Sequence, residues 1–290
     1  MTTTIIRTIE ELRKTVSRWR SMGGRVAVVP TMGALHEGHL SLVRAALAGT
    51  DWVIVTLFVN PRQFNSADDL TTYPRTENED LAKIETTGAH VLYAPNLEDM
   101  YPPGFATTVQ VGGVSQGLCG SHREGHFDAV ATIVTKLFLQ TGADIAYLGE
   151  KDFQQLHVVR RLAHDLDIPI EVVACPTIRD ADGMAMSSRN TRLSAEERKI
   201  ASHLPTILFE TAKKLSGGLE PREAIAEAQQ RLRTAGFAGV DYLELRSEAE
   251  LSSLDQLDRP ARLLGAATVG GTRLIDNVAV KPLPKLATSG

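Results

Sequence analysis

One stretch decides the fold of this chain: Val28-Val29-Pro30-Thr31-Met32-Gly33-Ala34-Leu35-His36-Glu37-Gly38-His39, continued by Leu40-Ser41-Leu42-Val43-Arg44-Ala45-Ala46-Leu47. A short apolar run from Val26 to Val29 stops at a proline and a glycine, which is typical of the end of a strand. Leu40, Val43 and Leu47 then recur at helical spacing. The pattern predicts a strand, a tight turn and a helix, with two histidines close to the start of the helix.

The predicted turn has the chemistry of a phosphate site. A helix N-terminus presents unpaired backbone N–H groups and a partial positive charge, and both favour phosphate. His36 and His39 would add donors, or a proton, where charge builds up when a phosphoanhydride is attacked. Two other interpretations stay open on residue chemistry alone, namely half of a metal site and a pair of surface histidines.

Composition bounds the class of protein. At 290 residues the chain can bury a substantial core, and its length favours two domains. The net charge of −4 gives no general field for attracting nucleic acid. Cys119 and Cys175 lie far apart without Cys-x-x-Cys spacing, which fits a reducing compartment. Because no secretory signal or membrane-spanning apolar run is evident, we expect a cytoplasmic protein with no membrane partner.

The larger part of the chain alternates strands with helices. Strands are expected at 51–59, 90–94, 144–149 and 170–175, with an extra one at 107–111. Helices are expected at 9–21, 79–87, 127–140 and 151–167, and polar or Gly-rich loops at 62–75 and 117–126. This alternation predicts a Rossmann-like, doubly wound parallel sheet.

After Pro176 the composition changes. Residues 177–192 are polar and irregular, and Ser194-Ala195-Glu196-Glu197 has the form of a capping box that starts a long helix ending near Gly217-Gly218. Pro221 opens a further helix to about residue 235, and strands follow at 240–245, 262–269 and from 273. The sequence predicts a Rossmann-like domain over 1–178 and a small α+β C-terminal domain over 179–290.

Two further groups of residues carry chemistry. Gly149-Glu150-Lys151-Asp152 lies at a strand end and opens a helix, where a lysine can follow the charge of a transferring phosphate. Met186-Ser187-Ser188-Arg189, at the domain junction, offers two hydroxyls and a guanidinium fork to phosphate oxygens. An ordinary solvated helix start and a common Ser-Ser-Arg string are the alternatives. Gln63 and Gln155 flank the same sheet edge, where their amides can bind hydroxyl or carboxylate groups of a small polar substrate; simple surface exposure is the alternative for two isolated glutamines.

The turn resembles a known signature. Thr31-Met32-Gly33-Ala34-Leu35-His36-Glu37-Gly38-His39 is similar to the His-x-Gly-His motif of the adenylyl-transferring superfamily, which includes class I aminoacyl-tRNA synthetases and small nucleotidyltransferases. With Pro30 it resembles the pantothenate synthetase (pantoate–β-alanine ligase) family in particular. Met186-Ser187-Ser188-Arg189 resembles the Lys-Met-Ser-Lys-Ser loop of the same superfamily.

Further strings match that family in order and spacing. They are Phe58-Val59-Asn60-Pro61-Arg62-Gln63-Phe64, Tyr73-Pro74-Arg75, Arg123-Glu124-Gly125-His126-Phe127, Gly149-Glu150-Lys151-Asp152-Phe153-Gln154-Gln155-Leu156, Asp182-Gly183-Met184-Ala185-Met186-Ser187-Ser188-Arg189-Asn190 and Asp241-Tyr242-Leu243-Glu244-Leu245. Two positions depart from the family pattern. Glu124 stands where a proline is expected, and Ala129 stands where a glycine is expected.

The resemblance implies a reaction and its residues. The reaction is the ATP-dependent condensation of (R)-pantoate with β-alanine to pantothenate through pantoyl adenylate, releasing AMP and pyrophosphate. The implied catalytic residues are His36, His39, Lys151 and Arg189, with His39 as the proton donor. The implied ATP site comprises Met32, Gly33, Ala34, Leu35, His36, Glu37, Gly38, His39, Gly149, Glu150, Lys151, Asp152, Ile178, Met186, Ser187, Ser188 and Arg189.

The substrates and the metal follow from the same resemblance. Gln63 and Gln155 hold the hydroxyls of pantoate, Asn60 lies near the β-alanine end, and Met32 walls the site. Mg²⁺ rides on the ATP phosphates, with Glu79 or Asp80 as possible contacts and no protein ligand assigned. A homodimer without a nucleic-acid partner is expected, and the polar stretch 65–72 is a hypothetical lid that keeps water from the adenylate.

Three other classes stay open. The first is a nucleotidyltransferase that keeps AMP on its product, against which the Asn60–Gln63 segment and the small C-terminal domain suggest a second, amine substrate. The second is a truncated tRNA synthetase, which is disfavoured because no basic anticodon-binding module is evident. A non-catalytic ATP sensor would not need the leaving-group stabilisers Lys151 and Arg189.

Overall fold

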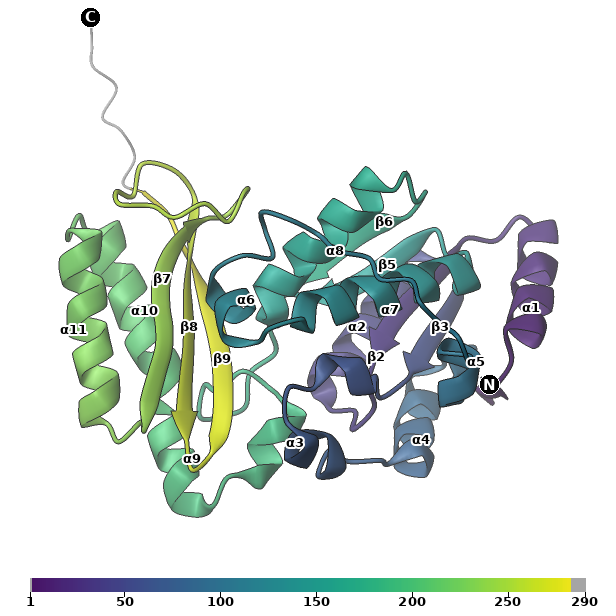
Figure 1. Cartoon of the computed structure of the whole chain (residues 1–290), viewed down its shortest axis with the longest axis horizontal. Coiled ribbons are helices and arrows are strands. Elements are labelled where there is room, and N and C mark those ends of the chain that lie inside the picture. The colour runs from purple at the N-terminus through teal and green to yellow at the C-terminus, as the bar shows by residue number, and fades with distance from the viewer. Residues whose placement is uncertain (1, 283–290) are drawn as a thin grey trace, which may run out of the picture. The chain divides into compact units, whose positions relative to one another are not determined.

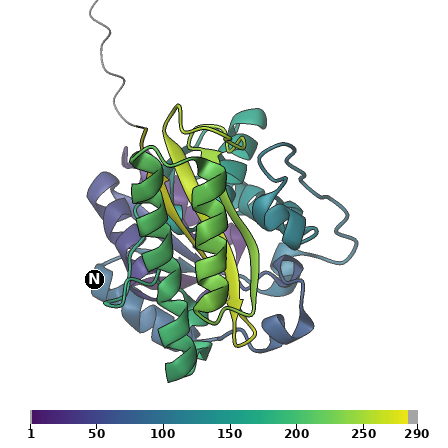
Figure 2. The same cartoon turned by 90° about the vertical axis from the view of Figure 1, so that its left-hand side faces the viewer.

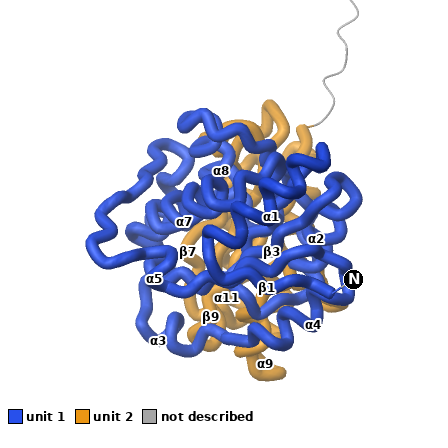
Figure 3. Tube along the Cα trace, turned by 90° about the vertical axis from the view of Figure 1, so that its right-hand side faces the viewer, with its two compact units in different colours: residues 1–178 blue, residues 179–290 orange. Residues whose placement is uncertain are grey.

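The computed structural model describes residues 2–282. The chain divides into two compact units, Met1–Ile178 and Arg179–Gly290, which Figure 3 colours separately.

Unit 1 is built on a six-stranded parallel sheet. Its strands are β1 (Thr4–Ile6), β2 (Val26–Thr31), β3 (Trp52–Leu57), β4 (Val91–Tyr93), β5 (Ile145–Gly149) and β6 (Glu171–Cys175). Their order across the sheet is β1-β4-β3-β2-β5-β6. The chain winds outward in one direction from β2 and in the other from β5, so the topological switch point lies between these two neighbours.

Helices cover both faces of this sheet (Figure 1). They are α1 (Ile9–Ser21), α2 (Glu37–Gly49), α4 (Glu77–Thr87), α7 (His126–Thr141) and α8 (Phe153–Asp165). α2 packs against α4, whereas α7 packs against α1 and α8. The residues from Val26 to Val29 all have 0% exposure. Because successive strand side chains point to opposite faces, this burial requires cover on both sides. The predicted doubly wound fold is confirmed.

Unit 2 is a small α+β structure. Strands β7 (Gly239–Ser247), β8 (Ala261–Val269) and β9 (Thr272–Val280) form an antiparallel sheet in the order β7-β8-β9. Helices α10 (His203–Ser216) and α11 (Pro221–Thr234) pack on one another and on this sheet, and Figure 2 shows them in green along the yellow strands. Leu204, Leu208 and Leu232 are among the buried side chains that join the two layers.

Two expected strand features were wrong. β2 does not stop at Val29 but continues through Pro30 and Thr31, which pair with Thr56 and Leu57 of β3. A proline is tolerated there because it lies near the end of the strand, where one missing N–H costs little. The expected strand at 107–111 is absent, although the structure describes all of these residues. The N–H of Val109 instead donates to Oγ1 of Thr132 on α7 at 2.9 Å, so a helix side chain replaces a strand partner.

Several expected loops contain short helices. The 62–75 stretch begins within the 3-10 helix η1 (Pro61–Gln63), in which Pro61 occupies the first turn, and it holds α3 (Ala67–Thr71), capped by Ser66. The Gly-rich stretch holds α6 (Leu118–His122). Short β1 and α5 (Leu97–Met100) were not expected.

The long helix expected after the Ser194 capping box is two helices. The box itself is confirmed, since Ser194 and Glu197 cap α9 (Ala195–Ala201) reciprocally, but α10 starts separately at His203. Pro205 explains the break, because it has no N–H for the carbonyl of Ala201 and its ring crowds that carbonyl. Pro221 does open α11 as predicted.

Candidate active site

The first part of the site is the turn after β2. Oγ1 of Thr31 donates to the carbonyl of Thr56 at 2.6 Å and accepts from the N–H of Gly33 at 3.3 Å. Gly33 and Ala34 both have left-handed backbone, with φ of +84° and +51°. A Cβ on Gly33 would lie 3.1 Å from Oδ2 of Asp80. The turn therefore requires glycine at this position, for its backbone angle and for its space.

A buried carboxylate on α4 holds this turn. Asp80 has 0% exposure and accepts from the N–H groups of Ala34 at 2.9 Å and Leu35 at 2.7 Å. The hydroxyl of Thr76 donates to Oδ2 of Asp80 at 3.1 Å. One turn along α4, Nζ of Lys83 donates to the carbonyl of Leu35 at 2.8 Å. Asp80 and Lys83 thus fix both polar backbone groups of the residue that precedes His36, through charge-assisted hydrogen bonds.

The two histidines lie at the start of α2. His36 is the N-cap residue, and its N–H donates to Nδ1 of His39 at 3.4 Å, with the ring centroids 4.1 Å apart. Because Nδ1 accepts, the hydrogen of neutral His39 is assigned to Nε2. The pKa of His39 is lowered to about 3, mainly by burial and also by His36, Lys151 and Lys83, while Asp152 opposes the shift. His39 is therefore uncharged at neutral pH and offers an N–H donor.

The second part of the site is the end of β5. Ligands of open parallel sheets bind at the carboxyl ends of the strands that flank the switch point, which here are β2 and β5. After Gly149 the chain forms the 3-10 helix η2 (Glu150–Asp152) and enters α8. The side chain of Lys151 is 21% exposed, with Nζ 3.7 Å from Asp152. Because β2 and β5 pair in parallel, their carboxyl ends lie side by side. Lys151 and Asp152 therefore lie near enough to His39 for their charges to affect its pKa.

Gln63 lies at a third strand end, beyond β3. It is buried, and its Oε1 accepts from Nδ2 of Asn60 at 3.0 Å. Asn60 has 0% exposure; its Nδ2 also donates to the carbonyl of Ala129 at 3.3 Å, and its Oδ1 accepts from the hydroxyl of Tyr101 at 3.0 Å. These contacts show that the Asn60 amide is used inside the protein, where it orients the side chain of Gln63.

Two residues next to Gln63 were missed as site candidates. Nη2 of Arg123 and Nδ1 of His126 lie 3.1 and 3.0 Å from the carbonyl of Gln63. Nη1 of Arg123 lies 2.9 Å from Nε2 of His126, so Nε2 accepts and Nδ1 carries the hydrogen. Their place in a family-like string was a signal, but only the structure shows that they fix the Gln63 backbone.

The two departures from the family pattern lie beside the same segment. The carbonyl of Glu124 accepts from Nδ2 of Asn65 at 2.7 Å, and the carbonyl of Ala129 accepts from Asn60. Both residues act through their backbone. A change of side chain at these positions therefore leaves the hydrogen bonds to the Asn60–Asn65 segment in place.

The two glutamines at the start of α8 differ in environment. Gln154 is buried, and its Nε2 donates to the carbonyls of Val114, Gln116 and Gly117 at 3.1 to 3.3 Å. Its Oε1 accepts from the N–H of Cys119. Gln155 is only half-buried. Gln154 therefore holds the preceding loop, and Gln155 is the glutamine with a side chain available to a ligand.

The remaining predicted residues belong to the start of unit 2 or its border. Ile178 ends unit 1. Ser187 caps the 3-10 helix η3 (Ser188–Arg192), its Oγ accepting from the N–H of Arg189 at 3.2 Å. Met186, Ser187, Ser188 and Arg189 are all half-buried.

Within residues 2–282 no three His, Cys, Asp or Glu side chains are grouped so that they could hold a metal ion. Over the same range none of the helices has the length and apolar character needed to cross a membrane.

Fold and site together define a class. A doubly wound sheet with a His-x-Gly-His turn at its switch point is an α/β protein of the adenylyl-transferring type. The family model for pantoate-beta-alanine ligase matches residues 4–279. A pantothenate synthetase of Chelativorans sp. (strain BNC1) is 63% identical over 280 residues, covering 97% of this chain and 99% of that protein.

Solved structures agree. The crystal structure of pantothenate synthetase from Thermus thermophilus has a TM-score of 0.91 at 42% identity, covering 97% of this chain and 100% of that one. The pantoate-beta-alanine ligase of Francisella tularensis, complexed with beta-gamma ATP and beta-alanine, has a TM-score of 0.80 at 31% identity, covering 95% and 97%. The chain therefore belongs to the pantoate–β-alanine ligase family, and it is a carbon–nitrogen bond-forming ligase, as the sequence predicted.

Proposed function

We propose that this chain carries out the family's reaction, the ATP-dependent condensation of (R)-pantoate with β-alanine, with the residues at the ends of β2, β3 and β5. The observation that carries the proposal is the grouping of His36, His39 and Lys151 at the switch point of the sheet. The start of a helix, two imidazoles and an ammonium can donate hydrogen bonds to the oxygens of an ATP triphosphate.

The reaction has two steps. A carboxylate oxygen of pantoate attacks the α-phosphorus, the bond to the β-phosphate oxygen breaks, and pyrophosphate leaves. The amine of β-alanine then attacks the acyl carbon, loses a proton and displaces AMP, which keeps the oxygen that came from pantoate. No residue of the protein is acylated or adenylylated, so catalysis rests on positioning and on stabilising charge.

The triphosphate is assigned to the β2 turn and the β5 end. The groups offered to the phosphates there are the N-terminus of α2, His36, Gly38 and the Nε2–H of His39. Because the pKa of His39 is about 3, its role is to donate a hydrogen bond from the neutral ring; the phosphate charge raises this pKa when ATP binds. Lys151 follows the charge on the departing pyrophosphate.

The rest of the ATP site is assigned by the family resemblance. Ser187, Ser188 and Arg189 of unit 2 complete the phosphate contacts. The other residues line the nucleotide, and they are Met32, Gly33, Ala34, Leu35, Glu37, Gly149, Glu150, Asp152, Ile178 and Met186.

Gln63 and Gln155 are assigned to the hydroxyls of pantoate. Gln63 is held by Asn60 through its side chain and by Arg123 and His126 through its carbonyl. This support fixes the orientation of its amide, as a substrate-binding group requires. The nearness of Asn60 to β-alanine stays a prediction, and its contacts favour a role in orienting Gln63.

Mg²⁺ is proposed as part of the substrate, MgATP. Magnesium is commonly held by substrate phosphates with one or two carboxylates. Glu79 is exposed, whereas both oxygens of Asp80 already accept backbone N–H groups. Asp80 is therefore better suited to holding the turn, and the ATP phosphates are the main ligands of Mg²⁺.

Three features of the setting are also proposed. A homodimer follows from the family resemblance, and light scattering of the purified protein tests it. A cytoplasmic location fits Cys119 and Cys175, which are both buried and not joined to each other. Residues 65–72, which contain α3, are proposed as a lid that keeps water from the adenylate. Hydrogen exchange of that segment with and without ligands tests this.

The reaction is tested by leaving out one substrate. The purified protein is mixed with MgATP and pantoate, and pyrophosphate and AMP are measured before and after β-alanine is added. Pyrophosphate formed in proportion to enzyme, followed by AMP only on addition of β-alanine, is the expected result. A nucleotidyltransferase would release no AMP, and an ATP sensor would release neither product; both results contradict the proposal.

A further inference from the structure

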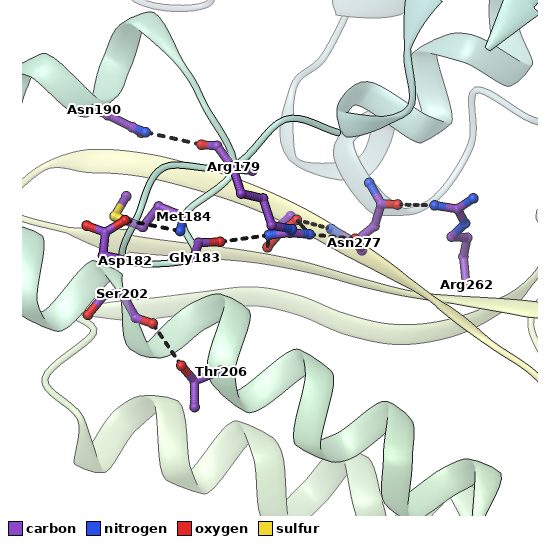
Figure 4. A network of polar contacts seen from close by, with 11 residues as sticks. Arg179, Asp182, Gly183, Met184, Asn190, Ser202, Thr206, Arg262 and Asn277 are labelled. Atoms are coloured by element: carbon purple, nitrogen blue, oxygen red, sulfur yellow. Dashed lines mark hydrogen bonds and ion pairs between the residues drawn. The ribbon is translucent and has the colours of Figure 1, made fainter. Parts of the chain in front are cut away.

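The segment before Ser187 in unit 2 is a tight hairpin (Figure 4). The N–H of Asp180 donates to the carbonyl of Met184 at 2.8 Å, and the N–H of Gly183 donates back to the carbonyl of Asp180 at 2.9 Å. Oδ1 of Asp182 accepts from the N–H of Met184 at 3.2 Å. Arg179 and Ala185 close the hairpin as an antiparallel bridge.

Arg179 fastens this hairpin to β9. Its guanidinium makes a two-pronged contact with Asp276, Nη1 to Oδ2 at 2.7 Å and Nη2 to Oδ1 at 3.0 Å. Nη1 also donates to the carbonyl of Gly183 at 3.0 Å, so one side chain joins the tip of the hairpin to the sheet. The Asp276 side chain is 2% exposed and that of Arg179 is 21% exposed. A bidentate, largely buried pair fixes direction as well as distance.

Asp276 is itself held from the sheet side. Its Oδ1 accepts from the N–H of Asn277 at 2.7 Å. Oδ1 of Asn277 accepts from Nη1 of Arg262 at 3.0 Å, and Nη2 of Arg262 donates to Glu248 at 3.0 Å. Figure 4 shows Asn277 between Arg179 and Arg262. The carboxylate that receives Arg179 is thus set in place by β8 and β9.

The far side of the loop has an anchor of its own. Nδ2 of Asn190 donates to the carbonyl of Ala185 at 3.1 Å. Nη2 of Arg198 on α9 donates to Asp180 at 2.9 Å, and its Nε donates to Asp182 at 2.8 Å. The residues Met186–Arg189 therefore lie between two fixed points, Ala185 before them and Asn190 after them.

We propose that Arg179 and Asp276 are positioning residues for Arg189. Their ion pair fixes the loop on unit 2 before the nucleotide binds, so the guanidinium meets the phosphates without the entropy cost of ordering a loose loop. The inference rests on the proposed role of Ser187, Ser188 and Arg189 at the ATP phosphates. It adds that the geometry of these residues is set by a pair that touches no substrate.

The test uses Asp276→Asn and the milder Arg179→Lys in the full-length chain. Arg246→Lys is the matched control, because Arg246 is a 15% exposed partner of Glu244 on β7, at the opposite edge of the same sheet. The rate of pantoate-dependent pyrophosphate formation is measured at saturating ATP, below the unfolding transition of every variant. We expect kcat to fall about ten- to a hundredfold in the two test variants, with a smaller change in KM for ATP, and no comparable change in the control.

A double-variant cycle separates positioning from general stability. If Asp276 acts through Arg189, adding Asp276→Asn to Arg189→Ala lowers kcat no further than Arg189→Ala alone. Amides of residues 180–190 also exchange faster in Asp276→Asn, while those of α10 do not. Additive losses in kcat, or a lowered Tm with unchanged kcat, overturn the inference. Unchanged kcat in Arg189→Ala instead overturns the proposed role of the loop, and the inference with it.

Discussion

The backbone N–H of His36 donates to Nδ1 of His39 at 3.4 Å. This contact uses the ring nitrogen of His39 that is nearer the backbone and assigns its hydrogen to Nε2. The imidazole therefore has one end facing the turn and one end that can donate to a phosphate oxygen. The pKa of about 3 keeps the ring neutral at physiological pH.

Substituting His39 by asparagine or by glutamine tests which nitrogen of the imidazole ring is needed for turnover. Glutamine can place an N–H near the position of Nε2, whereas asparagine can replace only the acceptor at Nδ1. We expect His39→Asn and His39→Ala to lose about a hundredfold or more in kcat, the size of one lost preorganised donor, and His39→Gln to lose less. Pyrophosphate release measures kcat, and circular dichroism checks that each variant is folded. Normal turnover in His39→Ala, or better turnover in the asparagine variant, contradicts this role.

The same residue makes stability depend on pH. The pKa of His39 is lowered from 6.5 to about 3 in the folded chain. As pH falls below about 6.5 the unfolded chain takes up a proton that the folded chain refuses, so stability is lost between pH 6.5 and 3. The slope is at most about 1.4 kcal/mol per pH unit, and smaller because the side chain is only half-buried in the structure.

Urea unfolding at pH 7 and pH 5 measures this effect. We expect His39→Gln to lose less stability than the parent chain between the two pH values, because glutamine does not titrate. Identical pH dependence in both chains would show that His39 titrates normally in the folded state.

Asp80 is predicted to matter through the shape of the turn. Asp80→Asn replaces an acceptor of two N–H groups by an amide that can present its own donor to one of them. We expect a loss of about 1–3 kcal/mol of folding free energy and a raised KM for ATP. Urea unfolding and initial rates measure the two effects. Glu85→Gln is the control, because Glu85 is exposed on the same helix; equal effects at both positions would contradict the assignment.

At two adjacent positions of the turn a Cβ is predicted to be unfavourable, so that adding one destabilises the chain and removing one does not. Gly33→Ala places a Cβ at a φ of +84° and 3.1 Å from Asp80, which costs about 1–3 kcal/mol. Ala34→Gly removes a Cβ from a residue already at a φ of +51°, so its stability stays equal or rises. Thermal unfolding measures both variants. A stable Gly33→Ala chain would show that the turn relaxes easily.

Local patterns predicted the parts of the site that are adjacent in sequence. The strand, turn and helix around His36 and His39 follow from an apolar run, a glycine and helical spacing, and the order of strands brings Lys151 to the same edge. The strand predicted at Thr107–Val111 was wrong. Its alternation of apolar and polar residues is equally compatible with an extended segment that is hydrogen-bonded to a helix side chain, here Thr132.

Long-range support could not be predicted from patterns. Asp80 and Lys83 look like ordinary members of a polar helix, and only tertiary structure places them against Leu35. The nearness of Asn60 to a substrate stays a prediction, and no sequence pattern shows that its buried amide holds Gln63. Arg179 and Asp276 are far apart in the chain, so their pairing also depends on the fold.

In the reaction of this chain, pantoate attacks the α-phosphorus of ATP before the amine reacts. Pantoate labelled with ¹⁸O in its carboxylate, turned over with MgATP and β-alanine, tests this directly by mass spectrometry of the AMP produced. We predict one ¹⁸O atom in AMP and none in pyrophosphate. Unlabelled AMP, or label in pyrophosphate, would contradict attack of the pantoate carboxylate at the α-phosphorus.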